Sequence, residues 1–142
     1  ESPRRDGNKI YLHVSKNENG SYAAVETLAA GILDLAHLRR DALLVDPFCG
    51  SGTFLIEGAL RASRIAPGLH RNFAAECFSQ AFGDAFFEER RRAQAFVCSE
   101  VPFRARGYDL DEQVVRMARE NIARAGIGDR VSASVRSFQQ FS

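Results

Sequence analysis

The sequence of 142 residues lacks the long apolar run of ~20 residues that a membrane-spanning helix needs. Its first six residues, Glu1–Asp6, also lack the apolar core of a signal peptide. Charge of one sign is not in excess either, because 19 Lys and Arg against 18 Asp and Glu leave a formal charge of +1. The net charge of the chain therefore produces no electrostatic field that would attract a polyanion. Any affinity for RNA must come from local patches of basic residues.

Cysteines are few and widely spaced. Cys49, Cys77 and Cys98 form no CxxC pair, and an odd number does not suit a disulfide framework. We therefore expect a protein of a reducing compartment, the cytoplasm, without a zinc site and without a membrane partner. Cys49 has no His or second Cys near it in the sequence, which favours a small packing residue over a nucleophile.

What is present is the composition of a globular domain, with 45% hydrophobic and 26% charged residues. Strand-like and helix-like patterns alternate along the chain. The expected strands cover residues 9–14, 42–45, 104–108 and 131–135, and the expected helices cover 25–38, 53–64, about 82–96 and 111–125. The continuous apolar run at 42–45 predicts a strand buried on both faces. This alternation is typical of a parallel sheet wrapped in helices, which is the Rossmann-like α/β class.

A glycine-rich loop follows the strand at 42–45. Gly50 and Gly52 allow a sharp turn and a close approach of the backbone to a ligand. Asp46 and Asp109 each end an expected strand, so they should meet the loop at the carboxyl edge of the sheet. In the alternative interpretation, the glycines only form a turn and both acids only cap helices.

Two nucleotide-binding fingerprints do not fit this loop. A dinucleotide site would have a third glycine where Leu55 stands, and a phosphate-binding P-loop would have a lysine directly after Gly52. NAD and ATP are therefore disfavoured as ligands.

Several segments together resemble the THUMP-associated RNA guanine-N2 methyltransferases, which include bacterial enzymes that methylate large-subunit ribosomal RNA. The segments that carry the resemblance are Val45–Thr53 (VDPFCGSGT), Ile65–Leu69 (IAPGL) and Gly107–Asp111 (GYDLD), with support from Glu26–Ala30 (ETLAA) and Ala118–Asn121 (AREN). The resemblance spans about residues 24–141. It implies the Rossmann-like class I methyltransferase fold, of which the N-terminal half is expected here.

The resemblance also implies the cofactor S-adenosylmethionine (SAM) and the residues that hold it. The implied set is Thr27 near the SAM carboxylate, Asp46, Phe48, Gly50 and Gly52 around the methionine part, Asp109 at the ribose, Leu110 over one adenine face and Ser137 near the adenine amino group. Asp111 is expected to cap the following helix instead. No catalytic residue is assigned, because the Asn/Asp-Pro-Pro-Tyr loop of the family does not occur in this sequence.

The expected organisation is a polar segment at residues 1–23 with a short strand or hairpin, followed at 24–142 by a partial SAM-binding methyltransferase domain. We expect the chain to be a fragment. The strand at 42–45 should then have an open edge that promotes self-association, unless the strand at 9–14 folds back to cover it.

The leading hypothesis for function is SAM-dependent methylation of guanine N2 in ribosomal RNA, with RNA as the partner. The alternatives are a DNA adenine-N6 methyltransferase and a non-catalytic module that binds SAM or RNA. Arg90, Arg91 and Arg92 either contact RNA phosphates or, as the adjacent acids favour, form a solvated helix face. Phe82, Phe86 and Phe96 are expected to be a core stripe of their helix.

Overall fold

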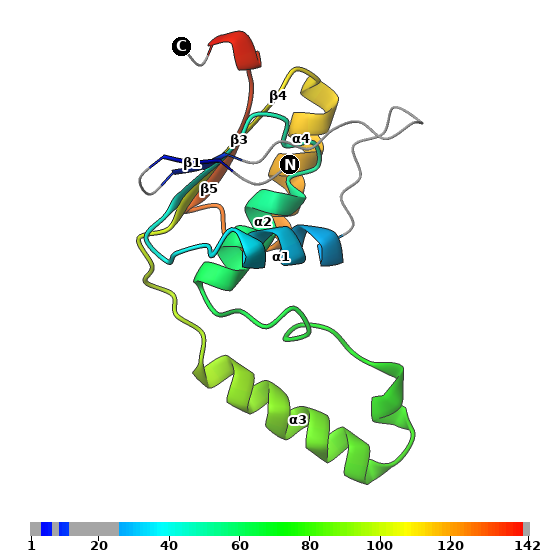
Figure 1. The fold of residues 1–142 in the computed structure, drawn as a ribbon. Coiled ribbons are helices and arrows are strands. Elements are labelled where there is room, and N and C mark those ends of the chain that lie inside the picture. The colour runs from blue at the N-terminus through cyan, green and yellow to red at the C-terminus, as the bar shows by residue number, and fades with distance from the viewer. Residues whose placement is uncertain (1–3, 7–8, 12–25, 141–142) are drawn as a thin grey trace.

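The computed structural model describes residues 4–6, 9–11 and 26–140. The strands are β1 (Arg4–Asp6), β2 (Lys9–Tyr11), β3 (Leu43–Asp46), β4 (Arg104–Asp109) and β5 (Val131–Val135). They form one sheet in the order β1-β2-β3-β4-β5 (Figure 1). β1 and β2 are antiparallel, whereas β2, β3, β4 and β5 run parallel. Strands joined by helical crossovers confirm the predicted α/β class.

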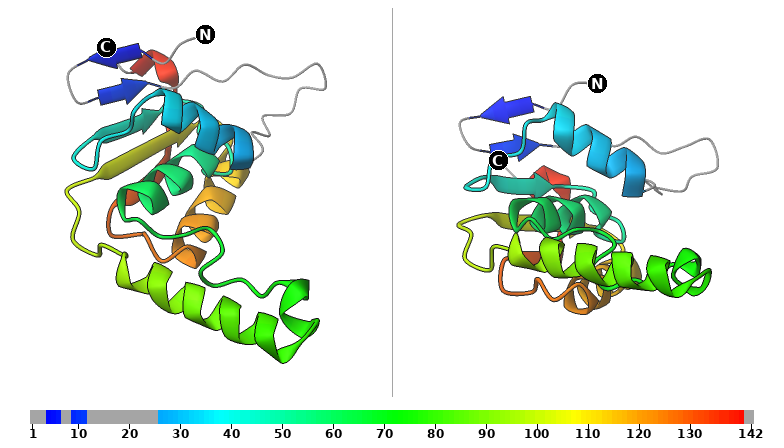
Figure 2. Two further views of the ribbon diagram at one scale, coloured as in Figure 1. Left: turned by 60° about the horizontal axis from the view of Figure 1, so that its bottom comes forward. Right: turned by 90° about the horizontal axis from the view of Figure 1, so that it is seen from below.

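The helices are α1 (Glu26–Leu35), α2 (Thr53–Ala62), α3 (Gln80–Ala95) and α4 (Glu112–Arg124), with short 3-10 turns η1 (Ala74–Cys77) and η2 (Phe138–Gln140). α2 packs against β3, β4 and β5, α4 against β4 and β5, and α1 against α2. Figure 2 shows these three helices gathered beside the sheet, with α3 standing apart. The core lies between them and the strands, and its most deeply buried side chains include Leu33, Leu44, Leu55, Phe103 and Ile127.

Burial along the strands alternates from residue to residue. In β4, Ala105 and Gly107 are buried while Arg104 and Arg106 are exposed. The same alternation leaves Leu43 in β3 only half-buried, because successive side chains point to opposite faces of a sheet. The prediction that this strand is buried on both faces is therefore wrong, since α2 packs against one face of it.

The edge of β3 that does not face β4 is paired with β2. Lys9, Ile10 and Tyr11 lie opposite Leu43, Leu44 and Val45 in parallel register. The structure thus has the second of the two expected arrangements, in which the N-terminal strand covers the edge. Residues 12–14 of that predicted strand lie outside the described residues. The division of the chain at residue 23 stays a prediction.

The helix α3 does not contribute to the core. Phe82 is 52% exposed and Phe96 is 64% exposed, so the predicted core stripe is wrong. The third member, Phe86, stacks on Phe73 of the preceding connector, with ring centroids 5.3 Å apart. The helical period correctly identified an apolar face, but that face does not pack on the sheet, because the connectors hold α3 away from it (Figure 1).

Candidate functional site at the carboxyl ends of β3 and β4

The conformation of the loop after β3 is set by the backbone angles of its glycines and by a hydrogen bond to Asp46. The Asp46 side chain is only 2% exposed, and its Oδ1 accepts a hydrogen bond from the Phe48 amide at 3.1 Å. Gly50 and Gly52 have φ angles of 52° and 87°, which is the left-handed region that favours glycine. The chain can therefore reverse within a few residues and enter α2 directly after Gly52.

Asp109 at the end of β4 joins this loop. The Gly50 amide donates to Oδ2 of Asp109 at 3.1 Å, and the Asp111 amide donates to Oδ1 at 3.1 Å. Each carboxylate oxygen can accept a further hydrogen bond, because one amide occupies only one of its lone-pair directions. The structure thus brings together the loop and the two strand-end acids that the sequence placed at one edge.

Close backbone contact between the loop and β4 depends on Gly107. The Cys49 amide donates to the Tyr108 carbonyl at 2.8 Å. A Cβ atom at Gly107 would lie 2.7 Å from Cys49 Cβ and would also collide with Leu55. Burial raises the pKa of the Cys49 thiol to about 12, so the side chain stays protonated and acts as a packing residue rather than a nucleophile.

Asp46 is an unusual carboxyl group. Its pKa is raised to about 6, chiefly by burial and to a smaller extent by the nearby Asp109 carboxylate, while the hydrogen bond from the Phe48 amide opposes the shift. Near neutral pH the group is therefore close to its titration range, and a cation brought to it would favour the ionised form.

The remaining predicted residues have varied surroundings. Asp111 caps α4, since its Oδ1 accepts from the amides of Gln113 and Val114, as predicted. Leu110 is 71% exposed beside Asp109. Ser137 follows β5, and its hydroxyl accepts from the Gln139 amide at 3.3 Å. Thr27 lies in α1, and its side chain is outside the described part of the structure.

Comparison with known proteins identifies the family. The family model described as RMKL-like, methyltransferase domain, matches residues 16–142. The chain belongs to this family. A candidate RNA methyltransferase, YpsC of Bacillus subtilis (strain 168), is 34% identical over 96% of this chain and 35% of its own length. The ribosomal RNA large subunit methyltransferase K/L of Aliivibrio fischeri (strain MJ11) is 34% identical over 91% of this chain and 19% of its own length.

Solved structures of similar proteins support the same family assignment. SMU.472, a candidate methyltransferase crystallised with S-adenosylhomocysteine (SAH), is 34% identical and superimposes with a TM-score of 0.75 over 82% of this chain and 31% of its own. A predicted N6-adenine-specific DNA methylase from Listeria monocytogenes is 31% identical, with a TM-score of 0.80 over 89% of this chain and 33% of its own. The Rossmann-like methyltransferase fold is confirmed, and this RMKL-like domain spans about a third or less of the length of these proteins.

Two residues that support the site of this RMKL-like domain were not predicted from the sequence. The Asn121 side-chain amide donates to the Ser51 carbonyl at 3.1 Å and so ties α4 to the glycine loop. The Phe138 ring, in η2, lies 5.6 Å from the Phe48 ring. Asn121 belongs to a segment of the family resemblance, which was a usable signal, whereas nothing in the local pattern around Phe138 indicated a ring contact with the loop.

Within the described part of the chain, no helix is long and apolar enough to cross a membrane. The same residues contain no cluster of three or more His, Cys, Asp or Glu side chains placed to hold a metal ion.

Proposed function

We propose that this chain is the SAM-binding part of an RNA methyltransferase that methylates N2 of guanine in ribosomal RNA. The observation that carries the proposal is the hydrogen bond from the Gly50 amide to Asp109, which joins the glycine loop to the acid of the neighbouring strand. A loop and an acid in this arrangement suit a ligand with an amino-acid part and a ribose. The SAH bound in SMU.472 supports the same assignment.

The donor set fits SAM. Asp109 keeps acceptor capacity on both carboxylate oxygens and would accept the two ribose hydroxyl groups. Asp46 would hold the ligand ammonium group, directly or through water, in its ionised form. Leu110, with most of its side chain exposed, would cover one face of the adenine. SAM, when bound, supplies an electrophilic methyl group, and these residues of the chain fix its position.

The proposed substrate rests on the relatives and on the sequence resemblance. The K/L relative is named for ribosomal RNA, and YpsC is named as an RNA methyltransferase. The segment Ile65–Leu69 adds to the case for RNA, because it is part of the resemblance to the guanine-N2 enzymes. The choice of guanine N2 as the methylated atom rests on the sequence resemblance.

The second candidate function is methylation of adenine N6 in DNA. It is favoured by the Listeria monocytogenes neighbour, which is described as a DNA methylase and covers 89% of this chain. The two functions require the same cofactor site, so the geometry around Asp46 and Asp109 does not separate them.

Transfer of a labelled methyl group distinguishes the two candidates. The protein encoded by the complete reading frame would be incubated with tritiated SAM and with either ribosomal RNA or DNA, and the products would be digested to nucleosides and separated. We expect label in N2-methylguanosine. Label in N6-methyldeoxyadenosine would support the second candidate instead. A titration of this chain with SAH tests the cofactor site alone, and absence of binding to a folded sample would overturn the proposal.

A further inference from the structure

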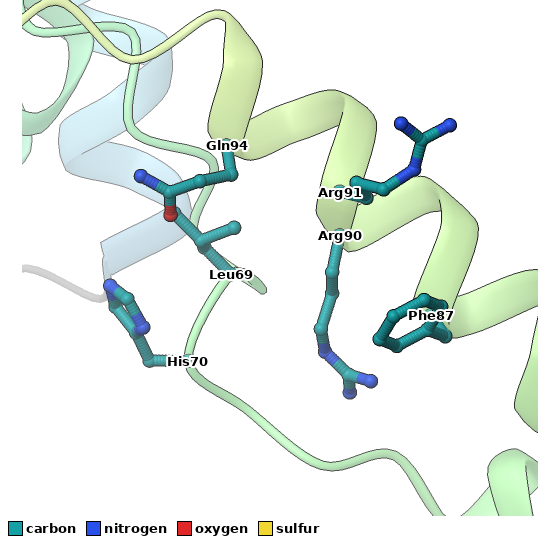
Figure 3. Close-up of a pocket in the computed structure, with 6 residues that line it drawn as sticks. All are labelled: Leu69, His70, Phe87, Arg90, Arg91 and Gln94. Atoms are coloured by element: carbon teal, nitrogen blue, oxygen red, sulfur yellow. The ribbon is translucent and has the colours of Figure 1, made fainter.

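A hollow lies between α3 and the segment that precedes it, on a part of the molecule that the cofactor site does not use. Its lining residues are Leu69, His70, Phe87, Arg90, Arg91 and Gln94, and we call it the α3 hollow (Figure 3). Leu69 and His70 come from the connector after α2, and the other four come from α3. Because the chain passes from α3 into the start of β4, the hollow lies toward the end of the sheet opposite Asp109.

The hollow is formed by the connector after α2 and by α3, and contacts between these two parts hold them in a fixed arrangement. Glu76 accepts hydrogen bonds from the Phe73 amide at 2.6 Å and from Arg90 Nη1 at 3.0 Å. Phe73 stacks on Phe86, and Ser79 caps α3 by accepting from the Phe82 amide. The connector and α3 therefore present a surface of fixed shape, although α3 does not contribute to the core.

The three consecutive arginines of α3 have different surroundings, since successive residues of a helix point about 100° apart. Arg90 lines the hollow but is fixed by its ion pair with Glu76. Arg91 also lines the hollow, and its guanidinium pairs with Glu88 at 3.0 Å. Arg92 pairs with Glu89 at 2.8 Å and does not line the hollow. The sequence could not separate these three roles.

The lining has the chemistry of a nucleotide site. It combines two apolar side chains, of which Phe87 is 65% exposed, with three basic residues and one amide, and no carboxylate lines it. An exposed aromatic ring offers a stacking surface to a base. The ion pair of Arg91 with Glu88 is solvent-exposed and therefore weak, so a phosphate group can replace the glutamate as its partner.

We propose that the α3 hollow binds one nucleotide of an RNA chain, with the base on the exposed ring of Phe87 and the phosphate on Arg91, one helical turn further along α3. This inference rests on the proposed function, because RNA is the substrate class proposed there. The nucleotide bound here is not the methylated one, since the hollow lies away from Asp46 and Asp109. The hollow instead holds a part of the RNA at a distance from its target base.

The test measures binding of a short fluorescein-labelled single-stranded RNA to this chain at low salt, by fluorescence anisotropy. We expect Phe87→Ala to weaken binding about tenfold through loss of stacking. Arg91→Ala should weaken binding about threefold and reduce the salt dependence by about one phosphate contact. Circular dichroism and SAH titration should be unchanged for both variants, because neither side chain contributes to the core or contacts the described residues of the cofactor site.

Matched controls lie on the same helix. Arg92→Ala and Phe82→Ala remove an exposed arginine and an exposed phenylalanine outside the hollow, and each should change RNA affinity less than about twofold. Equal losses in the control and hollow variants would overturn the proposal, and so would RNA binding too weak to detect. Displacement of the labelled RNA by polyglutamate at lower concentrations than by unlabelled RNA would mean that the hollow recognises an acidic peptide. A dimer that dissociates on Phe87→Ala would mean that a second copy occupies it.

The two proposals fail in different ways. If no variant binds SAH, the proposed function fails. If SAH binds normally and the affinity for RNA does not depend on Phe87 or Arg91, the proposed cofactor site is supported and the inference about the α3 hollow is wrong.

Discussion

The Gly50 amide donates a hydrogen bond to Oδ2 of Asp109 at 3.1 Å, across 59 residues of sequence. This bond connects the loop after β3 to the end of β4, while Oδ1 of the same carboxylate receives the Asp111 amide. The carboxylate is thus oriented before any ligand arrives. Preorganisation of this kind lowers the cost of ordering the site on binding.

Loss of the Asp109 carboxylate should weaken cofactor binding. We expect Asp109→Ala to reduce the affinity for SAH by ~1–3 kcal/mol, because charge-assisted hydrogen bonds to the ribose and the tie to Gly50 are lost together. Isothermal titration measures the effect. Asp84→Ala, which removes an exposed acid on α3, serves as the control and should bind SAH like the unmodified chain. Equal affinity in Asp109→Ala would show that this acid does not hold the ligand.

Asp46 should give stability an unusual dependence on pH. Its folded pKa of about 6 lies above its ordinary value near 3.8, so folding takes up a proton between those values. The contribution of Asp46 to the free energy of unfolding should therefore rise as the pH falls from about 7 to about 4, by up to about 3 kcal/mol. Asp46→Asn should remove this contribution and stabilise the chain near pH 7. Urea denaturation of both proteins at several pH values checks the sign, and identical pH profiles would contradict it.

The same carboxyl group should make ligand binding depend on pH. If ionised Asp46 holds the SAM ammonium group, affinity should fall as the pH drops below about 6, because protonation removes the charge. Titration with SAH between pH 5 and pH 8 measures this, with the circular dichroism spectrum recorded at each pH. A flat profile in the unmodified chain would mean that Asp46 has no charge interaction with the ligand.

Two glycine substitutions should have opposite effects on stability. Gly107→Ala places a Cβ against Leu55 and Cys49 in a packed interior and should lower the free energy of unfolding by about 1–3 kcal/mol or more. Gly31→Ala lies in α1 with no atom within 4 Å of the added Cβ and should raise it by about 0.5–1 kcal/mol. Thermal unfolding of both variants gives the comparison. Stabilisation by Gly107→Ala would show that the loop after β3 does not pack on β4 as described.

Pairing of β2 with β3 should keep the β3 edge from associating with other molecules. We expect the amides of Leu43, Leu44 and Val45 to exchange slowly with deuterium, and light scattering to show no association through this edge. Deletion of residues 1–11 should expose the edge and promote self-association. Fast exchange at these amides in the undeleted chain would mean that β2 does not protect them in solution.

The sequence by itself determined the features that depend on neighbouring residues. The alternation of strands and helices, the glycine turn at Gly50 and Gly52, and the cap of α4 by Asp111 were all predictable, because periodicity, backbone freedom and capping act within a few residues. The convergence of Asp46 and Asp109 was predictable as well. The carboxyl ends of adjacent parallel strands lie at one edge of a sheet, whatever the details of its packing.

Tertiary structure decided which surfaces meet. The apolar face of α3 was visible in the sequence, yet only the packed structure shows that Phe82 and Phe96 face away from the core. Likewise, the pairing of β2 with β3 and the ring contact between Phe48 and Phe138 join residues far apart in the chain. A local pattern specifies that a side chain is apolar or that a strand can pair, but its partner is selected by the competition among all surfaces when the chain packs. That competition is a property of the whole fold.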